Sequence, residues 1–313
     1  MTRAFLFPGQ GAQTIGMGRD LAETWPAARA VFDEVNAALG EDLSALIWEG
    51  EIATLTLTAN AQPALMACSL AAMRALEAEG VDVTAAGYVA GHSLGEYSAL
   101  TAAGALSVGD AARLLRARGQ AMQAAVPVGQ GAMAAILGLD LAAVQSVVEA
   151  AAQGQVCTAA NDNDPAQVVV SGHKDAVERA VAEAKSAGAK RALLLPVSAP
   201  FHCALMEPAA RAMAEVLASV DITAPKVPVV ANVVAEPVTD PATIRSLLVD
   251  QICGSVRWRE SVQFMAAQGV CETWELGAGK ALSGMVKRID RSVAAKAVNT
   301  AADVRSAAET ILA

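Results

Sequence analysis

The segment that decides the expected fold runs Tyr88-Val89-Ala90-Gly91-His92-Ser93-Leu94-Gly95-Glu96-Tyr97. Its apolar start predicts a short strand, and the residues after Gly95 predict a helix. Glycines that flank a serine at a strand-to-helix turn permit a backbone tight enough to expose the hydroxyl, as in a nucleophile elbow. Gly-x-Ser-x-Gly also occurs by chance in ordinary turns, but this context favours a nucleophilic Ser93. The helix N-terminus would stabilise an oxyanion formed beside it.

On both sides of this segment, short apolar runs alternate with helical patterns, which predicts an α/β unit with a mainly parallel sheet. On the N-terminal side we expect a strand at Ala4–Phe7, a glycine-rich loop, and helices at Leu21–Leu39 and at Ala64–Glu79, the latter starting after Pro63. On the C-terminal side, after Pro200, we expect two helices and two strands, namely Pro208–Ser219, Val227–Asn232, Cys271–Leu276 and Ala302–Leu312.

Between about Val126 and Ser198 the pattern changes, and a glycine-containing hinge at 127–131 leads into a smaller unit. The order of its elements is β-α-β-β-α-β, the ferredoxin-like arrangement. They are expected at Ala132–Leu137, Leu141–Ala152, Val156–Ala160, Gln167–Ser171, Lys174–Ala187 and Arg191–Val197, with 161–165 as the turn of the middle hairpin. The fold class is thus α/β, with residues 1–126 and 199–313 as a large subdomain and residues 127–198 as a small inserted one.

A nucleophilic serine needs a general base, and the chain has three histidines. His92 precedes Ser93 and should diverge from it at the elbow, while His173 begins a surface helix and is expected to cap it or face solvent. His202 lies where the chain returns from the small unit, and such connections often carry catalytic side chains. We therefore predict His202 as the base, with a structural histidine as the alternative.

No acid stands out as the third member of a triad. The aspartates between the serine and the histidine lie in the small unit or, for Asp110, look like a helix cap. A dyad in which a neutral acceptor holds the imidazole is as plausible as a triad. The candidates are Asp110, Asp140, Asp162, Asp164 and Asp175.

The helix expected from Asp110 to Val126 carries Arg118 at the centre of its apolar face, whereas Arg113 and Arg116 point away. A buried arginine is costly unless an anion meets it. The pattern leaves two alternatives open, a structural carboxylate or a bound ligand. A ligand carboxylate would suit the planar guanidinium.

Composition excludes several functions. The chain has 313 residues, a net charge of -9, a pI near 4.9 and 4% aromatic residues, which disfavours nucleic-acid binding. The uncharged stretch Ile52–Met73 holds threonines, Asn60 and Gln62, so it is not a membrane span. No signal-peptide pattern precedes the first strand and the five cysteines are scattered, which predicts a reduced, cytoplasmic protein.

The glycine-rich loops do not match nucleotide-binding motifs, since Gly9-x-Gly11-x-x-Thr14 lacks the third Rossmann glycine and Gly277-x-Gly279-Lys280 lacks P-loop spacing. Isolated histidines offer no metal site, and Cys203 is expected to be packing. Glycines after a first strand can instead bring a backbone N–H to a reacting carbonyl. This makes the amides of Gln10 and Leu94 the predicted oxyanion hole.

Six ordered motifs together resemble the malonyl-CoA:acyl-carrier-protein transacylases across nearly the whole chain. They are Phe7–Gln13 (FPGQGAQ), Asn60–Pro63 (NAQP), Gly91–Tyr97 (GHSLGEY), Arg118-Gly119, Pro196-Val197-Ser198 with His202, and Gly277–Lys280 (GAGK). The resemblance implies an α/β-hydrolase-like large subdomain, a ferredoxin-like small one, and an active site between them.

Carried over by motif, the resemblance implies Ser93 as nucleophile, His202 as base, and Arg118 as the ligand of the malonyl carboxylate. Gln251 matches the family position whose backbone carbonyl orients the histidine, and Gln62 and Asn161 match positions near the acyl group. The implied partners are malonyl-CoA and an acyl carrier protein. No cofactor is expected, because the CoA thioester is itself a substrate, and we expect a monomer.

One departure is Phe201, where separate bacterial members often have a serine. Phe-His resembles the malonyl-selective domains of polyketide synthases, so the resemblance favours malonyl over methylmalonyl groups and leaves fatty-acid and polyketide synthesis both open. Because carrier proteins are acidic and this chain is too, docking needs a local basic patch. The candidates are Lys280, Lys287, Arg288 and Arg291, with a solvated helix face as the alternative.

Two other functions compete with acyl transfer to a carrier. A serine hydrolase would share the elbow, and a non-catalytic carrier-binding module would share the fold. Arg118 and the inserted unit argue against the first, and intact Ser93, His202 and Arg118 argue against the second.

Overall fold

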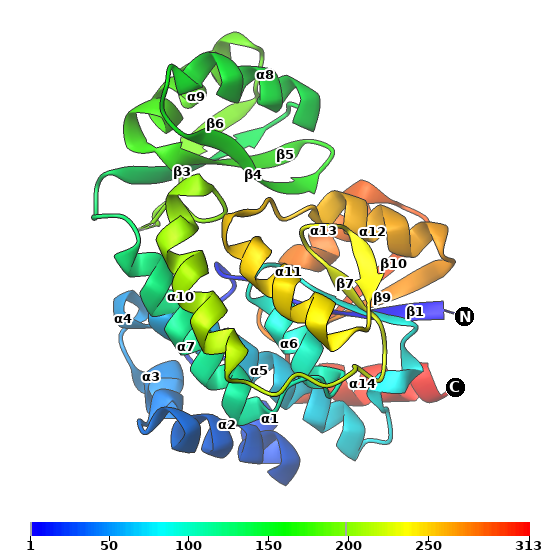
Figure 1. The fold of residues 1–313 in the computed structure, drawn as a ribbon. Coiled ribbons are helices and arrows are strands. Elements are labelled where there is room, and N and C mark those ends of the chain that lie inside the picture. Colours follow the sequence, from blue (N-terminus) through cyan, green and yellow to red (C-terminus); the bar gives the residue numbers. More distant parts are fainter. Residues whose placement is uncertain (1, 198) are drawn as a thin grey trace.

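The computed structural model describes residues 2–197 and 199–313, which form two subdomains, each built on its own sheet (Figure 1). Figure 1 shows the small subdomain, in green, above the larger one. The expected class is confirmed: a mixed α/β fold whose larger sheet is mainly parallel and whose smaller sheet is antiparallel. The boundaries at 127 and 198 stay predictions, and Ser198 lies outside the described residues.

The larger sheet has six strands, with β1 and β2 side by side at its centre. Residues 4–7 of β1 are fully buried, as expected for a parallel strand covered on both faces. Phe7 pairs with Gly91, so both strands end at the same edge, where the loops that follow them meet. In sheet order the strands are β10 (Ala294–Val298), β9 (Val270–Leu276), β1 (Thr2–Phe7), β2 (Tyr88–Gly91), β7 (Val229–Ala231) and β8 (Glu236–Val238).

Helices cover both faces of this sheet, and two apolar clusters hold them there. The larger cluster contains α2, α5 and α7, and the other packs Trp258 and Met265 of α12 against Leu6 and Ala90. The helices are α1 (Arg19–Thr24), α2 (Pro26–Leu39), α3 (Leu43–Glu49), α4 (Ile52–Thr56), α5 (Thr58–Ala78), α6 (Gly95–Ala102), α7 (Val108–Ala124), α10 (Glu207–Ala218), α11 (Pro241–Cys253), α12 (Trp258–Ala267), α13 (Ala281–Ile289) and α14 (Ala301–Leu312), with short 3-10 turns at Val83–Ala85 and Ala204–Met206.

Three helices have a boundary that differs from the sequence prediction by more than one residue. The helix expected over Leu21–Leu39 is broken at Trp25, which is extended, and restarts with Pro26 at its first position. Helix α5 starts at Thr58, so the expected start after Pro63 is wrong. The Leu57 carbonyl already accepts the N–H groups of residues 60 and 61, which forms a first turn ahead of the proline.

The third difference concerns α7, which begins at Val108 and not at Asp110. The side chain of Ser107 caps it by accepting the backbone N–H of Asp110. Asp110 therefore lies in the first turn, where its carboxylate pairs with Arg113.

The small subdomain has the predicted order of elements: β3 (Gly131–Leu137), α8 (Leu141–Ala152), β4 (Cys157–Asp164), β5 (Gln167–His173), α9 (Lys174–Ser186) and β6 (Arg191–Leu194). Its antiparallel sheet has the order β4-β5-β3-β6. Helices α8 and α9 pack on the sheet through a separate apolar cluster.

The polar run at 161–164 is strand, not the predicted turn. It extends β4 to Asp164, and residues 165 and 166 alone make the turn. These side chains are buried against the large subdomain, where Asp162 binds Arg259 and Asp164 binds Arg288. Asn161 also forms a parallel bridge with Val256. Partners on the other subdomain thus outweigh local turn preference.

Candidate active site

The elbow after β2 forces Ser93 into a left-handed backbone conformation with φ of 53°. Close packing explains both flanking glycines. A Cβ on Gly91 would lie 1.9 Å from the backbone of Gly95, and one on Gly95 would lie 2.2 Å from the Phe7 carbonyl oxygen. A side chain at either position would push the turn open, so the sequence pattern has a direct steric cause.

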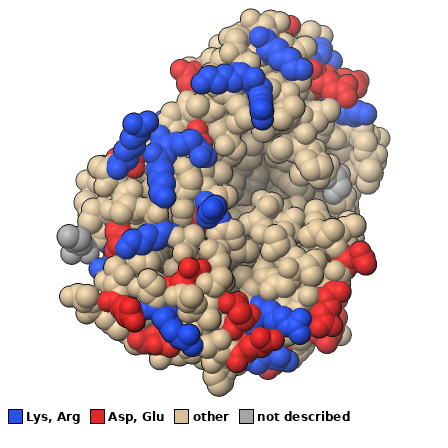
Figure 2. Space-filling model, turned by 180° about the vertical axis from the view of Figure 1, so that it is seen from behind, with Lys and Arg blue, Asp and Glu red and all other residues tan. Residues whose placement is uncertain are grey.

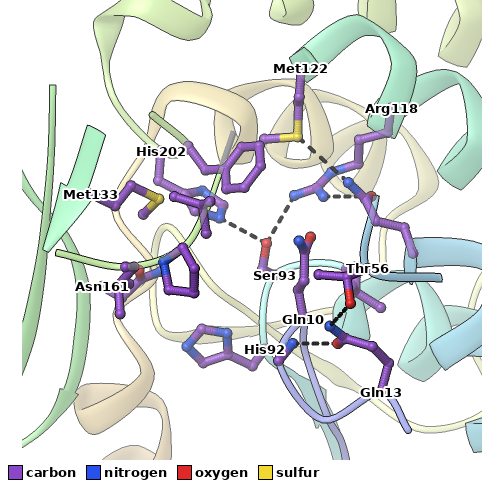
Figure 3. A pocket seen from close by; sticks show the side chains of 17 residues that line it. Gln10, Gln13, Thr56, His92, Ser93, Arg118, Met122, Met133, Asn161 and His202 are labelled. Atoms are coloured by element: carbon purple, nitrogen blue, oxygen red, sulfur yellow. Dashed lines mark hydrogen bonds between the residues drawn. The ribbon is translucent and has the colours of Figure 1, made fainter. Parts of the chain in front are cut away.

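The hydroxyl of Ser93 lies against an imidazole that is distant in the sequence. The Ser93 Oγ is 2.8 Å from Nε2 of His202 (Figure 3). Nδ1 of His202 is 2.9 Å from the backbone carbonyl oxygen of Gln251. A carbonyl can only accept, so Nδ1 carries the proton and Nε2 is the acceptor. Burial, together with the nearby Arg118 charge, lowers the pKa of His202 to about 3, which keeps the ring neutral and ready to accept the serine proton.

Arg118 completes the surroundings of the hydroxyl. One terminal nitrogen donates to Ser93 Oγ at 3.0 Å and to Oε1 of Gln251 at 2.8 Å, and the other donates to Oε1 of Gln62 at 2.8 Å. Its guanidinium carbon lies 5.6 Å from the centre of the Tyr97 ring. Its buried Nε has no hydrogen-bond partner among the described residues, and no described carboxylate pairs with it directly.

These groups open into a pocket of about 290 Å³. Gln10, Leu94, Gln62 and Asn161 all line it, together with Ser93, Arg118 and His202 (Figure 3). Gln251 lies fully buried behind it. The rest of the wall is mainly apolar and comes from both subdomains, with Met122, Met133, Leu195, Val197 and Phe201 among its members.

A chain of hydrogen bonds joins the loop after β1 to Arg118. Thr58 donates its hydroxyl proton to Oε1 of Gln10 at 2.9 Å and accepts from Nε2 of Gln62 at 3.0 Å. The Gln62 amide oxygen then accepts from Arg118. These hydrogen bonds therefore fix the position of the loop that carries Gln10 relative to the Arg118 guanidinium.

The backbone N–H of Ser93 donates to Oδ1 of Asn232 at 2.7 Å. The Ser93 N–H therefore already has a hydrogen-bond acceptor. Leu94 immediately precedes the first residue of α6 and lines the pocket beside Ser93. The positive end of the α6 dipole adds to the potential there. Gln10 and Leu94, whose amides the sequence predicted as the oxyanion hole, both line the pocket beside Ser93.

The other two histidines have structural partners. His92 is half-buried at the pocket wall, and its Nε2 lies 2.8 Å from Oδ1 of Asn163 in the small subdomain. Nδ1 of His173 accepts the N–H of Val156 instead of capping α9. Of the two roles expected from the sequence, capping or facing solvent, capping is therefore wrong, and the residue is half-buried.

None of the aspartates weighed for a triad bonds to His202. Asp140 caps α8, Asp162 and Asp164 pair with arginines, Asp110 pairs with Arg113, and Asp175 lies in the first turn of α9. The neutral carbonyl of Gln251 takes the position of the acid.

Sequence reasoning missed two buried residues of the site, Glu96 and Asn232. Asn232 accepts the Ser93 N–H, donates to the Gly91 carbonyl at 2.7 Å, and donates its own N–H to Glu96 at 2.9 Å. A signal for Glu96 was present, since it is the only charged residue in the otherwise apolar or uncharged α6. Asn232 carries no such signal, because an asparagine after a strand is typical of any turn.

The remaining predictions have mixed outcomes. Within residues 2–197 and 199–313 no group of three metal-binding side chains comes together, and no helix there is long and apolar enough to cross a membrane. The Cys203 thiol is buried and its pKa is raised by burial, as expected for packing. Lys280, Lys287 and Arg291 are exposed, but Arg288 pairs with Asp164. Figure 2 shows basic side chains beside the hollow between the two lobes.

The serine elbow, the pocket and the fold of two subdomains together are those of an acyl transferase. A family model described as "Acyl transferase domain" matches residues 4–304, so the chain belongs to that family. Within it, the chain belongs with the malonyl CoA-acyl carrier protein transacylases. It is 50% identical to the one from Escherichia coli K12 over 98% of both chains, and 47% identical to the one from Bacillus subtilis 168 over 98% of this chain and 96% of the relative.

Solved structures agree. An acyl-carrier-protein S-malonyltransferase from Bartonella henselae superposes with a TM-score of 0.98 at 54% identity and 100% coverage of both chains. A malonyl-transacylase solved in complex with a type II PKS acyl-carrier protein has a TM-score of 0.96 at 45% identity, covering 99% of this chain and 100% of the other.

Proposed function

We propose that this protein transfers the malonyl group of malonyl-CoA to the phosphopantetheine thiol of an acyl carrier protein, through a malonyl ester of Ser93. The relatives' names support the overall reaction. The observation that carries the chemistry is the position of Ser93 Oγ, 2.8 Å from a neutral imidazole and 3.0 Å from a buried guanidinium. One group can take the hydroxyl proton and the other can hold an anionic acyl group.

In the first half-reaction, Oγ attacks the thioester carbonyl while its proton passes to Nε2 of His202. The Gln251 carbonyl holds Nδ1–H and stabilises the imidazolium that forms. The amides of Leu94 and Gln10 receive the tetrahedral oxyanion. Collapse breaks the C–S bond, and the proton on Nε2 goes to the CoA thiolate.

The second half-reaction runs the same steps with a new thiol. His202 takes the proton of the phosphopantetheine thiol, the sulfur attacks the malonyl ester, and the proton returns to Ser93 Oγ. Protons balance in both halves without a further redox or metal group. We therefore propose that the protein needs no cofactor and works by a ping-pong sequence.

Arg118 selects the acyl group in this scheme. Its hydrogen bond to Ser93 Oγ supports this role, because a carboxylate on an acyl chain bound to Ser93 would lie near the guanidinium. Because no carboxylate of residues 2–197 and 199–313 pairs directly with Arg118, the ligand alternative from the sequence is the better supported of the two. The apolar wall, including Phe201, would exclude a branching methyl group.

We assign the protein to fatty-acid synthesis in the cytoplasm, acting as a monomer. The fatty-acid assignment rests on the similarity to curated relatives named malonyl CoA-acyl carrier protein transacylase. Service to a polyketide synthase is the second candidate, because one similar structure is a malonyl-transacylase bound to a type II PKS carrier.

Intact mass after brief exposure to malonyl-CoA tests the proposal. Native protein and the exposed-serine control Ser146→Ala should each gain the mass of one malonyl group, and Ser93→Ala should gain none. Holo carrier protein should then discharge the adduct to malonyl-carrier. A native enzyme that gains no adduct, or that loses it to water as fast as to the carrier, contradicts the transferase assignment and favours a binding module or a hydrolase.

A further inference from the structure

Glu96 is a buried acid for which the proposed mechanism has no use. It lies in the first turn of α6, every residue of which is buried, and its side chain is only 2% exposed. Its Oε2 accepts two hydrogen bonds of 2.9 Å, from the backbone N–H of Asn232 and from Nε2 of Gln251. A carboxylate held this deeply requires a compensating charge.

That charge is Arg118, and a single amide lies between the two. The Gln251 side chain accepts from Arg118 through Oε1 at 2.8 Å and donates to Glu96 through Nε2 at 2.9 Å. Cation, amide and carboxylate thus form a polarised chain in which each donor faces an acceptor. The same amide nitrogen lies 3.1 Å from the Ser93 carbonyl oxygen, so the chain runs directly beneath the nucleophile.

We propose that Glu96 is a positioning residue that acts as the counter-charge of Arg118 through the Gln251 amide and thereby limits how tightly Arg118 holds the acyl carboxylate. This deepens the proposed function and rests on it for the identity of the ligand. Before the acyl group binds, Glu96 balances the charge of the Arg118 guanidinium through the Gln251 amide, because no described carboxylate contacts the guanidinium directly. When the acyl carboxylate arrives, two anions share one cation, which weakens its grip and favours release of the product.

The charge of Glu96 can be changed by pH near neutrality. Burial raises the pKa of Glu96 to about 7, against its hydrogen bonds and Arg118, which lower it. The titratable groups around it are Tyr97, whose pKa burial raises to about 12, His202, whose pKa is about 3, and His92, whose pKa burial lowers. Arg118 stays charged. Of these groups, Glu96 is the one whose pKa is about 7, so its charge changes around neutral pH.

A stability cycle tests the coupling without any substrate. Glu96→Gln is introduced into the native protein, into Arg118→Lys, which keeps a cation, and into Arg118→Met, which does not. At pH 8 the change in melting temperature caused by Glu96→Gln should be less favourable by several degrees in the native and Lys backgrounds than in the Met background. Equal changes in all three would show that Glu96 only supports the elbow and would overturn the proposal.

A kinetic comparison tests the consequence for the acyl group. At pH 8, Glu96→Gln should raise the ratio of kcat/KM for malonyl-CoA over acetyl-CoA by about threefold or more, mainly through a lower KM for malonyl-CoA. At pH 5.5, where native Glu96 is protonated, the two enzymes should have the same ratio. A merely structural residue would change both substrates alike at both pH values, and that result refutes the proposal.

The two experiments separate the two proposals. If neither enzyme forms a malonyl adduct, the proposed function fails and the stability cycle alone decides on Glu96. If the adduct forms but the cycle shows no coupling to Arg118, the counter-charge role is wrong while the function stands.

Discussion

Nε2 of His202 lies 2.8 Å from Oγ of Ser93, although 109 positions separate the two residues in the chain. Both have positive φ angles, 53° for Ser93 and 58° for His202, so each is held by the surrounding structure in a conformation that non-glycine residues rarely adopt. The elbow holds the serine and the Gln251 carbonyl holds the imidazole. The reactive pair is thus preorganised before any substrate binds.

The low pKa of His202 gives a prediction about pH. Because burial and Arg118 keep the ring neutral, the rate of malonyl-serine formation at saturating malonyl-CoA, where a change in KM has no effect, should stay constant from about pH 7.5 down to about pH 5, measured by stopped acylation and intact mass. An acid limb near 6.5, the ordinary pKa of histidine, would contradict the buried geometry.

The same shift affects stability, because the unfolded chain protonates this histidine below about pH 6.5 while the folded protein does not. The contribution of His202 to the free energy of unfolding is therefore fully present above that pH and is lost as the pH falls towards 3. In this pH range, the free energy of unfolding should decrease less in His202→Gln than in the native protein.

Arg118→Ala should erode the preference for malonyl-CoA over acetyl-CoA. Losing a bidentate charged pair costs about 3–4 kcal/mol, which corresponds to roughly 10²–10³-fold in the ratio of kcat/KM. Arg116→Ala is the matched control, since it lies on the same helix but binds Asn60 and Glu41. If Arg118→Ala kept the full preference for malonyl-CoA over acetyl-CoA, Arg118 would not bind the acyl carboxylate.

Asn232→Ala should slow acylation by tenfold or more with little change in KM. It leaves the Ser93 N–H and the Gly91 carbonyl without partners, each at a cost of about 1–3 kcal/mol, so the elbow can relax. Asn299→Ala is the control, because that side chain also donates to a backbone carbonyl, that of Gly277, away from the nucleophile. If both variants lose stability and neither loses rate, Asn232 does not position the serine.

Phe201→Ser should make methylmalonyl-CoA a better donor relative to malonyl-CoA. Phe201 contributes to the apolar wall of the pocket, and accommodating one extra methyl group there is worth about 1–3 kcal/mol. Competition between the two thioesters, followed by the mass of the acyl-enzyme, measures the change. A ratio equal to that of the native enzyme would mean that other wall residues exclude the branch.

The predicted docking surface for the carrier protein is best tested with variants that leave Arg288 unchanged. A reversal there would break its 2.7 Å contact with Asp164 and so disturb the join between the subdomains, whereas Lys280 and Lys287 are exposed. Lys280→Glu with Lys287→Glu should raise the KM for carrier protein roughly threefold to tenfold and leave self-acylation by malonyl-CoA unchanged. Lys185→Glu on α9 is the control, and an unaltered carrier KM would place docking elsewhere.

Local patterns predicted much of this architecture. The alternation of strands and helices indicated the α/β class, and the small subdomain has the order of elements expected from its pattern, with the bounds of α8 unchanged. The failures came where distant partners override local preference. The sequence of residues 161–164 is typical of a turn. In the structure these residues form a strand, because Arg259, Arg288 and His92 of the large subdomain bind their side chains.

The sequence by itself determined the elbow, because two glycines around Ser93 are required by steric contacts within a few residues and with the neighbouring strand. It also singled out Arg118, since a charge on an apolar helix face is conspicuous in one dimension. Only the tertiary structure decided what meets these groups. The contact of His202 with the Gln251 carbonyl, the hydrogen bonds of Asn232 to the elbow and the hydrogen bonds that link Arg118 to Glu96 through Gln251 join residues 49 to 155 positions apart. Hydrogen-bond partners of that kind leave no periodicity in the sequence.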